Sequence, residues 1–278
     1  MSTDSDQAPV LLQVSAAGVA TITLNRPQVR NAYDGRVVQM LSDMLAELDA
    51  RADVRAVVLE GTGPSFCAGA DLAWMRRSGG LALADNQAEA ERLAATLRRL
   101  HTLRKPTLAL VQGHCMAGGL GFISACDIVV AERSAQFGVT EVRIGLIAST
   151  IAPYLVAAIG PRIARQYFLT GERFGAAEAH RIGLVHELVE DRPALQERRD
   201  SVLAALLAGA PGALAASKDL VDLVAWRSID DALTRETAVR MAATRAGAEA
   251  GEGMDAFLQK RRPAWAADSA PSLRGDRT

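Results

Sequence analysis

The sequence predicts an α/β protein with a parallel-sheet core followed by a helical region. Through the middle third, short apolar segments alternate with glycine-rich loops and helical segments, which is typical of parallel βαβ units with right-handed crossovers. After about Pro161 the chain becomes rich in alanine and leucine at helical spacing. The chain of 278 residues, 49% of them hydrophobic, is long enough to bury one full core. We therefore expect one large domain with a helical appendage.

Composition narrows the class of protein. The chain carries 31 basic and 32 acidic residues, a net charge of −1, which argues against bulk attraction to nucleic acid or an anionic membrane. Its three cysteines, Cys67, Cys115 and Cys126, lack CxxC spacing, so neither a disulfide framework nor a zinc knuckle is expected. The segment 1–9 is polar and has no signal-peptide pattern, and we expect a disordered tail there and a cytoplasmic location.

The first half of the chain gives three clear elements. The segment Val19–Leu24 is rich in β-branched residues and runs into a turn at Asn25–Pro27, so it predicts a strand. Asp34 can cap a helix, because the apolar residues after it keep helical spacing: Val37, Val38, Leu41, Leu45 and Leu48. The continuous apolar run Ala56–Leu59 predicts a strand buried on both faces.

The remaining elements follow the same logic. A helical segment before Lys105 and Pro106 places Leu93, Leu97 and Leu100 on one face. Two further strands are predicted at Thr107–Val111 and Asp127–Val130. Three helices are expected near the C-terminus, at Pro193–Ala210, Pro211–Trp226 and Ile229–Ala246.

Two glycine-containing loops follow predicted strands. In Ser65–Leu72, small residues allow a ligand to approach the backbone, and a free amide could face an anion. The alternative is a tight turn in which Asp71 caps the next helix. In Gln112–Gly121, the glycines stand where a helix begins, so amides and the helix dipole would favour negative charge. The alternative there is close helix–sheet packing; the loop matches neither a Walker A nor a GxGxxG pattern.

Glu141 is the candidate acid or base. It lies among apolar residues in Phe137–Leu146, and burial of a lone carboxylate raises its pKa into the range that suits proton transfer. The alternative is a salt bridge with Arg143 or another arginine. Two loops that donate backbone hydrogen bonds to one oxyanion, with a carboxylate beside them, could stabilise an enolate and move protons.

With these motifs in order, the chain resembles the enoyl-CoA hydratase/isomerase (crotonase-like) family from about Val19 to Trp265. The resemblance rests on several motifs: LNRPxxRNA, FCAGADL, KPxLALVQG, the Gly118–Gly119 loop, ACDIVVA, FGxxEVRxGL, AxxAxRIGLV and AFLQKRRPAW. It implies a crotonase-like spiral of ββα units over 10–200, an α-helical trimerisation region over 201–265 and a flexible tail over 266–278. It also implies an acyl-CoA substrate, no cofactor beyond the substrate's own coenzyme A, and a homotrimer or a dimer of trimers.

The resemblance also assigns site residues. The oxyanion-hole amides would be those of Ala68 and Gly118, and Glu141 would be one of two catalytic glutamates. Substrate-binding positions would be Arg30, Ala32, Ala70, Asp71, Leu72, Gly121, Phe257 and Lys260. Arg30, with Arg26, lies in a segment that runs along CoA in this family, and Lys260 lies in a motif that approaches the adenine and phosphates.

Gly121 is the main departure, because it stands where the family has its second glutamate. With one carboxylate, a Δ3–Δ2-enoyl-CoA isomerase is the alternative to a hydratase. The segments after Glu141 look like those of bacterial hydratases for methylglutaconyl-CoA and related branched acyl groups, a branch that tends to have glycine here. A non-catalytic acyl-CoA- or RNA-binding oligomer is the alternative of another class.

Two smaller expectations remain. Ser149 or Thr150 is expected to cap the helix that follows, with a contact to a polar acyl group as the alternative. The four histidines show no metal-ligand spacing, so no metal site is predicted.

Overall fold

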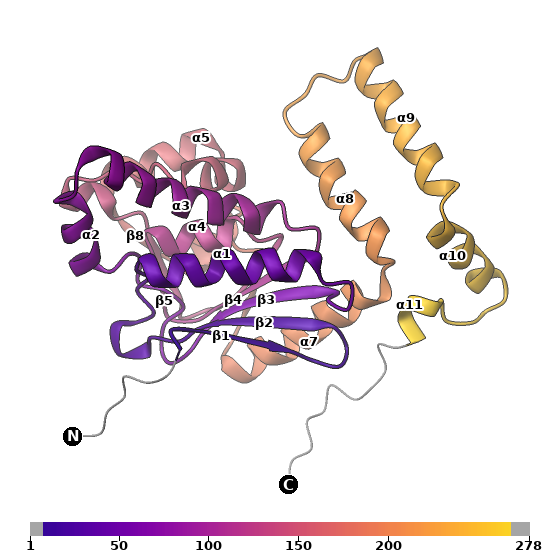
Figure 1. Cartoon of the computed structure of the whole chain (residues 1–278), viewed down its shortest axis with the longest axis horizontal. Helices are drawn as coiled ribbons and strands as arrows, with labels where there is room; N and C mark the ends of the chain where they lie inside the picture. Colours follow the sequence, from indigo (N-terminus) through magenta and orange to yellow (C-terminus); the bar gives the residue numbers. More distant parts are fainter. Residues whose placement is uncertain (1–7, 268–278) are drawn as a thin grey trace, which may run out of the picture.

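The computed structural model describes residues 8–267 and places a six-stranded sheet at the centre of the body (Figure 1). The strands run in the order β1 (Val10–Val14), β2 (Val19–Leu24), β3 (Ala56–Gly61), β4 (Thr107–Val111), β6 (Ile128–Glu132) and β9 (Glu187–Val189). Only β1 is antiparallel to its neighbour; the other pairs are parallel. The predicted parallel core is therefore confirmed, while β1 and β9 were not anticipated.

A second sheet of three short strands lies beside the first. It consists of β5 (His114–Met116), β7 (Gln136–Gly138) and β8 (Arg173–Gly175). The chain passes from β4 to β5 and then into helix α4 (Gly118–Ser124), and again from β6 to β7 before helix α5 (Ala152–Thr170). This repetition of two strands and a helix is the ββα spiral that the resemblance implied.

Helices cover both faces of the large sheet, which explains its continuous apolar strands. Val57 and Leu59 pack into the cluster that holds α1 (Gly35–Ala50) and α3 (Leu83–His101). Val58, which points to the opposite face, packs instead with leucines of α7 (Arg192–Ala208). Because a strand between two helical layers has no solvent face, its apolar residues need not alternate with polar ones.

Helix starts follow the predicted caps in two cases out of three. The Asp34 side chain accepts from the Val37 amide at 3.0 Å, and the Asp71 side chain caps α2 (Leu72–Gly79). The cap predicted at Ser149 or Thr150 is wrong: α5 begins after Ile151, without a side-chain cap. A proline in its first turn has no amide that needs a partner there.

The C-terminal part is a helical arm that extends from the body (Figure 1). It contains α8 (Pro211–Val224), α9 (Asp231–Arg245), α10 (Ala248–Leu258) and α11 (Ala264–Ala267), after the short α6 (Ala176–Arg181) and α7 of the body. The boundary predicted at residue 200 falls inside α7, which packs on the sheet. The predicted tails, 1–9 and 266–278, lie almost entirely outside the described residues.

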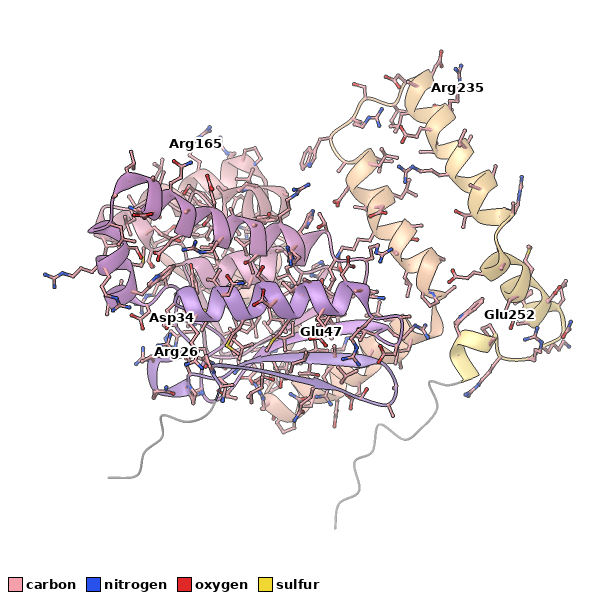
Figure 2. All side chains as sticks on the ribbon, in the orientation of Figure 1. Arg26, Asp34, Glu47, Arg165, Arg235 and Glu252 are labelled. Carbon is pink, nitrogen blue, oxygen red and sulfur yellow. The ribbon has the colours of Figure 1, made fainter. Side chains whose placement is uncertain are left out.

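One ion pair ties the arm to the sheet. Lys218 of α8 contacts Asp127 at 3.0 Å, and Asp127 also accepts from the Thr107 amide at 2.7 Å and from its hydroxyl at 2.8 Å. Other charged side chains point outward, such as Arg165 on α5 and Arg235 on α9 (Figure 2). Asp127 therefore joins two strands and one arm helix.

Over residues 8–267, no single helix is long and apolar enough to cross a membrane. Within that range, only α7 and α8 taken together have the length and apolar composition of a membrane span. The chain bends by 103° between these two helices.

Candidate functional site

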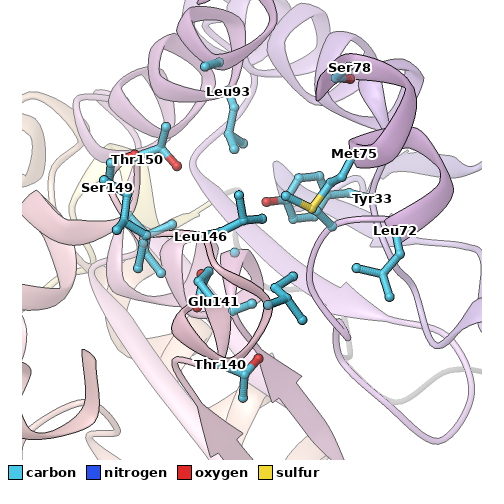
Figure 3. Close-up of a pocket in the computed structure, with 18 of the residues that line it drawn as sticks. Tyr33, Leu72, Met75, Ser78, Leu93, Thr140, Glu141, Leu146, Ser149 and Thr150 are labelled. Carbon is cyan, nitrogen blue, oxygen red and sulfur yellow. The ribbon is translucent and has the colours of Figure 1, made fainter. Parts of the chain in front are cut away.

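A cavity of about 810 Å³ lies between α2 and α3 on one side and the segment after β7 on the other (Figure 3). Residues from separate parts of the chain share its wall, among them Tyr33, Ala70, Gly118 and Glu141. The rest of the lining mixes apolar side chains with a few polar ones: Leu72, Trp74, Met75, Leu93, Leu146, Ser78, Glu89, Thr140, Ser149 and Thr150. Such a wall suits a largely apolar ligand held by a few polar groups.

The Ala70 amide is the first polar group directed at this cavity. Tyr33 donates its amide to the Gly69 carbonyl at 2.9 Å and accepts from the Asp71 amide at 2.7 Å, in a parallel bridge with Ala70. Because a bridged residue's own N–H and C=O point away from its partner, the Ala70 amide faces the other side. Within 8–267 it donates no backbone hydrogen bond.

This pairing corrects the predicted position of the first oxyanion amide. The Ala68 amide donates to the Arg30 carbonyl at 2.9 Å and so is not free for an oxyanion. Both Ala68 and Ala70 line the cavity, but only Ala70 offers its amide. The loop's composition alone could not distinguish the two positions, because the register with Tyr33 decides which amide is free.

Gly118 supplies the second amide. It is the first residue of α4, where amides have no partner within the helix and the dipole favours negative charge. A Cβ on Gly69 would lie 3.8 Å from the Gly118 nitrogen and 3.0 Å from Ala117 Cβ, so the two loops lie side by side. Two free amides from different loops therefore face the same cavity.

Glu141 begins the 3₁₀ helix Glu141–Ile144 and lies at the cavity wall (Figure 3). Its Oε2 atom is buried and has no hydrogen-bond partner among the described residues, and burial raises the pKa of this carboxyl. The predicted alternative of an ion pair with Arg143 is wrong, because the Arg143 Nε donates to the Gly171 carbonyl at 2.9 Å. The carboxylate is therefore available for chemistry.

Tyr33 is a site residue that the sequence analysis missed. The residue is 4% exposed, and its ring packs edge-on against Phe122, with ring centroids 5.3 Å apart. A Cβ placed on Gly118 would lie 2.0 Å from the Tyr33 hydroxyl oxygen, so this oxygen lies directly beside the Gly118 backbone. The only available signal was an aromatic residue just before the helix cap at Asp34.

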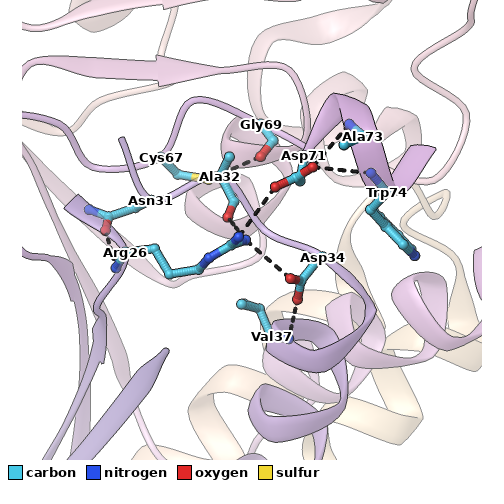
Figure 4. A network of polar contacts seen from close by, with 10 residues as sticks. All are labelled: Arg26, Asn31, Ala32, Asp34, Val37, Cys67, Gly69, Asp71, Ala73 and Trp74. Carbon is cyan, nitrogen blue, oxygen red and sulfur yellow. Dashed lines mark hydrogen bonds and ion pairs between the residues drawn. The ribbon is translucent and has the colours of Figure 1, made fainter. Parts of the chain in front are cut away.

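A polar network holds the first loop in place (Figure 4). Arg26 donates to the Ala32 carbonyl at 2.6 Å and forms ion pairs with Asp34 at 3.3 Å and Asp71 at 3.2 Å. Asn31, in a left-handed conformation with φ of 57°, donates to the carbonyl groups of Thr62 and Ser65. The Arg26 guanidinium is therefore held by three partners within the fold.

The other predicted binding residues fall into three groups. Ala70 and Leu72 line the cavity, whereas Ala32 and Asp71 lie behind it in the Arg26 network, and Arg30 is exposed outside it. Phe257 and Lys260 belong to the arm, far from the cavity of their own chain (Figure 1). These last two cannot complete the site within one chain.

Gly121 does not reach the cavity. It is buried one turn after Gly118 in α4, and a Cβ at this position would lie 2.3 Å from Ile151 Cγ2. The side chain of Ile151 lines the cavity there, so the wall opposite Gly121 is apolar. In the part of the chain that the structure describes, no group of three or more metal-binding side chains exists.

Comparisons with known proteins agree with one another. The family model described as enoyl-CoA hydratase/isomerase matches residues 15–268. A mevalonyl-coenzyme A hydratase (sidH) of Aspergillus fumigatus is 32% identical, over 89% of this chain and 91% of the relative. A short-chain-enoyl-CoA hydratase of Clostridium acetobutylicum is 30% identical, over 88% and 92%.

Solved structures share the whole fold. An enoyl-CoA hydratase from Shewanella pealeana superposes with a TM-score of 0.90 at 34% identity, covering 94% of this chain and 97% of that one. Pseudomonas aeruginosa AtuE gives 0.88 at 37% identity, covering 93% and 100%. The predicted fold class, a crotonase-like spiral with C-terminal helices, is confirmed.

Proposed function

Because this chain belongs to the enoyl-CoA hydratase/isomerase family, we propose that it is an enoyl-CoA hydratase and works through an enolate. The observation that carries this proposal is the meeting of the free amides of Ala70 and Gly118 with the Glu141 carboxylate in one cavity. Acyl-CoA is the substrate class of the family, and coenzyme A arrives as part of the substrate. No other cofactor is called for by this chemistry.

In the proposed reaction, the two amides hydrogen-bond to the thioester oxygen of the enoyl-CoA. Glu141 takes a proton from water as the water oxygen forms a bond to C3, and the C2–C3 π electrons move to give the enolate. The proton on Glu141 then passes to C2, the thioester carbonyl re-forms, and a 3-hydroxyacyl-CoA results. Removing one such donor typically costs about 10²–10³-fold in rate, so the amides stabilise the charge that develops on oxygen.

A Δ3–Δ2-enoyl-CoA isomerase is the second candidate, and the apolar wall between Gly121 and Ile151 favours it. An isomerase needs one base that removes a proton from one carbon and returns it to another. A hydratase with one carboxylate must use that group twice, for water and for C2. The two reactions consume different substrates, so one assay separates them.

For the acyl group, we propose a branched, glutaconyl-type chain. Arg143 and Arg173 line the cavity and supply positive charge for an anionic part of the substrate. If that part is the acyl carboxylate, Arg173→Ala lowers turnover of 3-methylglutaconyl-CoA more than that of crotonyl-CoA. Equal losses on both substrates would assign the arginine to the CoA phosphates. Mevalonyl-CoA is a third substrate to compare, because the sidH relative is named a mevalonyl-coenzyme A hydratase.

We also propose a homotrimer or a dimer of trimers in the cytoplasm. The helical arm exposes apolar side chains that an interface between copies would cover: Val221, Trp226, Ile229, Val239 and Met241. Phe257, which is 83% exposed, and Lys260 would then reach the CoA site of a neighbouring copy. The three cysteines are free and buried, which suits a reducing compartment.

The test is turnover by the purified protein of crotonyl-CoA, 3-methylglutaconyl-CoA and a 3-enoyl-CoA. Hydration of at least one of the first two supports the proposal. Isomerisation of the 3-enoyl-CoA without hydration of either would reject it in favour of the isomerase. Turnover of none of them, with salt-sensitive binding of RNA, would point to the non-catalytic alternative.

A further inference from the structure

The hydroxyl group of Tyr33 has no evident structural purpose. The ring packs against Phe122 and Trp74 and is almost completely buried, yet its hydroxyl makes no hydrogen bond within the described residues 8–267. The hydroxyl oxygen is not among the buried side-chain atoms without a partner, so it is accessible from the cavity that Tyr33 lines. Phenylalanine would pack in the same space but would place no hydrogen-bond donor at the cavity.

Both oxyanion amides lie in contact with this one residue. The Tyr33 backbone hydrogen-bonds to Gly69 and Asp71 on either side of Ala70, which leaves the Ala70 amide directed toward the cavity. The Tyr33 hydroxyl oxygen lies beside the Gly118 backbone. Figure 3 shows the hydroxyl directed into the cavity rather than into the core. The phenol thus stands with the two amide donors, where the thioester oxygen would bind.

We propose that the Tyr33 hydroxyl is a third donor of the oxyanion hole and donates a hydrogen bond to the thioester oxygen as the enolate forms. This inference rests on the proposed function. Glu141 serves as the base, and an anionic carboxylate cannot stabilise negative charge on the thioester oxygen, so that charge has to be met by hydrogen-bond donors. A further donor at the oxygen makes the enolate more stable without another titrating group.

The environment keeps the phenol in its donor form. Burial raises the pKa of Tyr33, and the nearby Cys67 and Glu141 raise it further. The hydroxyl therefore stays protonated over the whole working range of pH. It offers one hydrogen to the oxyanion and takes no part in proton transfer.

Tyr33→Phe tests the proposal, because it removes one oxygen and keeps the ring. We expect kcat/KM for enoyl-CoA to fall about 10²-fold, the usual cost of losing one oxyanion donor. Tyr154→Phe is the matched control: it removes a phenol outside the cavity lining and should leave kcat/KM unchanged. Equal thermal unfolding of the two variants and the parent excludes a folding defect.

A second measurement requires only that a ligand binds and does not depend on turnover. Acetoacetyl-CoA bound in the site ionises at C2 to an enolate that absorbs in the ultraviolet, and oxyanion donors lower the pH at which it does so. In Tyr33→Phe this pH should rise by about one unit or more, since a donor worth about tenfold shifts it by one unit. An unchanged ionisation together with unchanged kcat/KM would overturn the proposal.

The same pair of readouts separates this inference from nearby ones. Slower hydration with unchanged enolate formation would also overturn it, and would assign the hydroxyl to the reacting water instead. If the parent protein turns over no enoyl-CoA, the proposed function fails. The ionisation of bound acetoacetyl-CoA still decides whether Tyr33 donates to the oxygen.

Discussion

The side chain of Ile151 fills the space into which a side chain at Gly121 would extend, with Ile151 Cγ2 only 2.3 Å from the position of a Cβ on Gly121. An aliphatic side chain therefore occupies the space at position 121, where the family has its second glutamate. The two residues are distant in the sequence, but α4 and α5 pack together there. Position 121 therefore offers no second carboxylate to act beside Glu141.

This contact predicts the effect of the smallest substitution at position 121. Gly121→Ala should lower the free energy of unfolding by about 1–3 kcal/mol, the usual cost of overpacking a core. Gly79→Ala is the control, since a Cβ there has open space and alanine has a higher helix propensity than glycine. Urea unfolding of both variants measures the difference; an unaffected Gly121→Ala would mean that Ile151 moves aside.

The raised pKa of Glu141 has a consequence for stability. An acid whose pKa is higher in the folded than in the unfolded state costs stability once pH passes through that range, because the unfolded state ionises first. Glu141→Gln should therefore unfold at an equal or higher temperature than the parent at pH 7. A clear drop in the unfolding temperature would show that the carboxylate stabilises the fold.

The same shift sets the pH dependence of the reaction. As general base, Glu141 has to be ionised, so kcat/KM should fall on the acid side at a pH above the usual value of about 4.3 for a glutamate. A pH–rate profile measures this limb. A profile that stays flat down to the ordinary pKa of a glutamate would contradict the proposed role of burial.

The ion pair between the arm and the sheet should contribute to stability. Asp127→Ala leaves Lys218 without its anion and the Thr107 amide without its acceptor, and should cost about 2–4 kcal/mol of unfolding free energy. Arg133, which meets Glu190 in an exposed pair, gives the control: Arg133→Ala should cost about 0–1 kcal/mol. Equal effects of the two changes would contradict this account.

The Arg26 network should affect activity only by holding the Ala70 loop in its position. Arg26→Met keeps the stem but leaves Asp34 and Asp71 without their cation and the Ala32 carbonyl without its donor. We expect a loss of about tenfold or more in kcat/KM with an unchanged pH profile, because a small displacement of an oxyanion loop is costly. Arg76→Met, on the exposed side of α2, should have no effect on kcat/KM.

Much of the fold could be predicted because its signals are local. The apolar runs of β3 and β4 and the helix caps at Asp34 and Asp71 are visible in a few adjacent residues. The three-residue strands of the small sheet are not, since Gln136–Gly138 is too short to show a period. These strands pair with one another across long separations in the sequence, so their pairing is set by the folded spiral and not by local sequence.

The site was predictable to the level of its loops but not of its atoms. Glycine and alanine at the ends of β3 and β4 indicated two amide-bearing loops, and Glu141 was expected beside them. One parallel bridge, between Tyr33 and Ala70, decides which alanine has a free amide. The register of this bridge cannot be read from the amino-acid composition of the loop. The closure at Gly121 likewise depends on Ile151, the residue that precedes another helix, α5.

Glu141 is the residue that we propose to move the protons, and steady-state hydration of crotonyl-CoA by Glu141→Gln measures that role. Glutamine keeps the size of the side chain and removes the base, so we expect kcat to fall by about 10³-fold, within the range for loss of a general acid–base group. Substrate binding should remain, because Ala70 and Gly118 are untouched. A variant that retains turnover within tenfold of the parent would contradict the account.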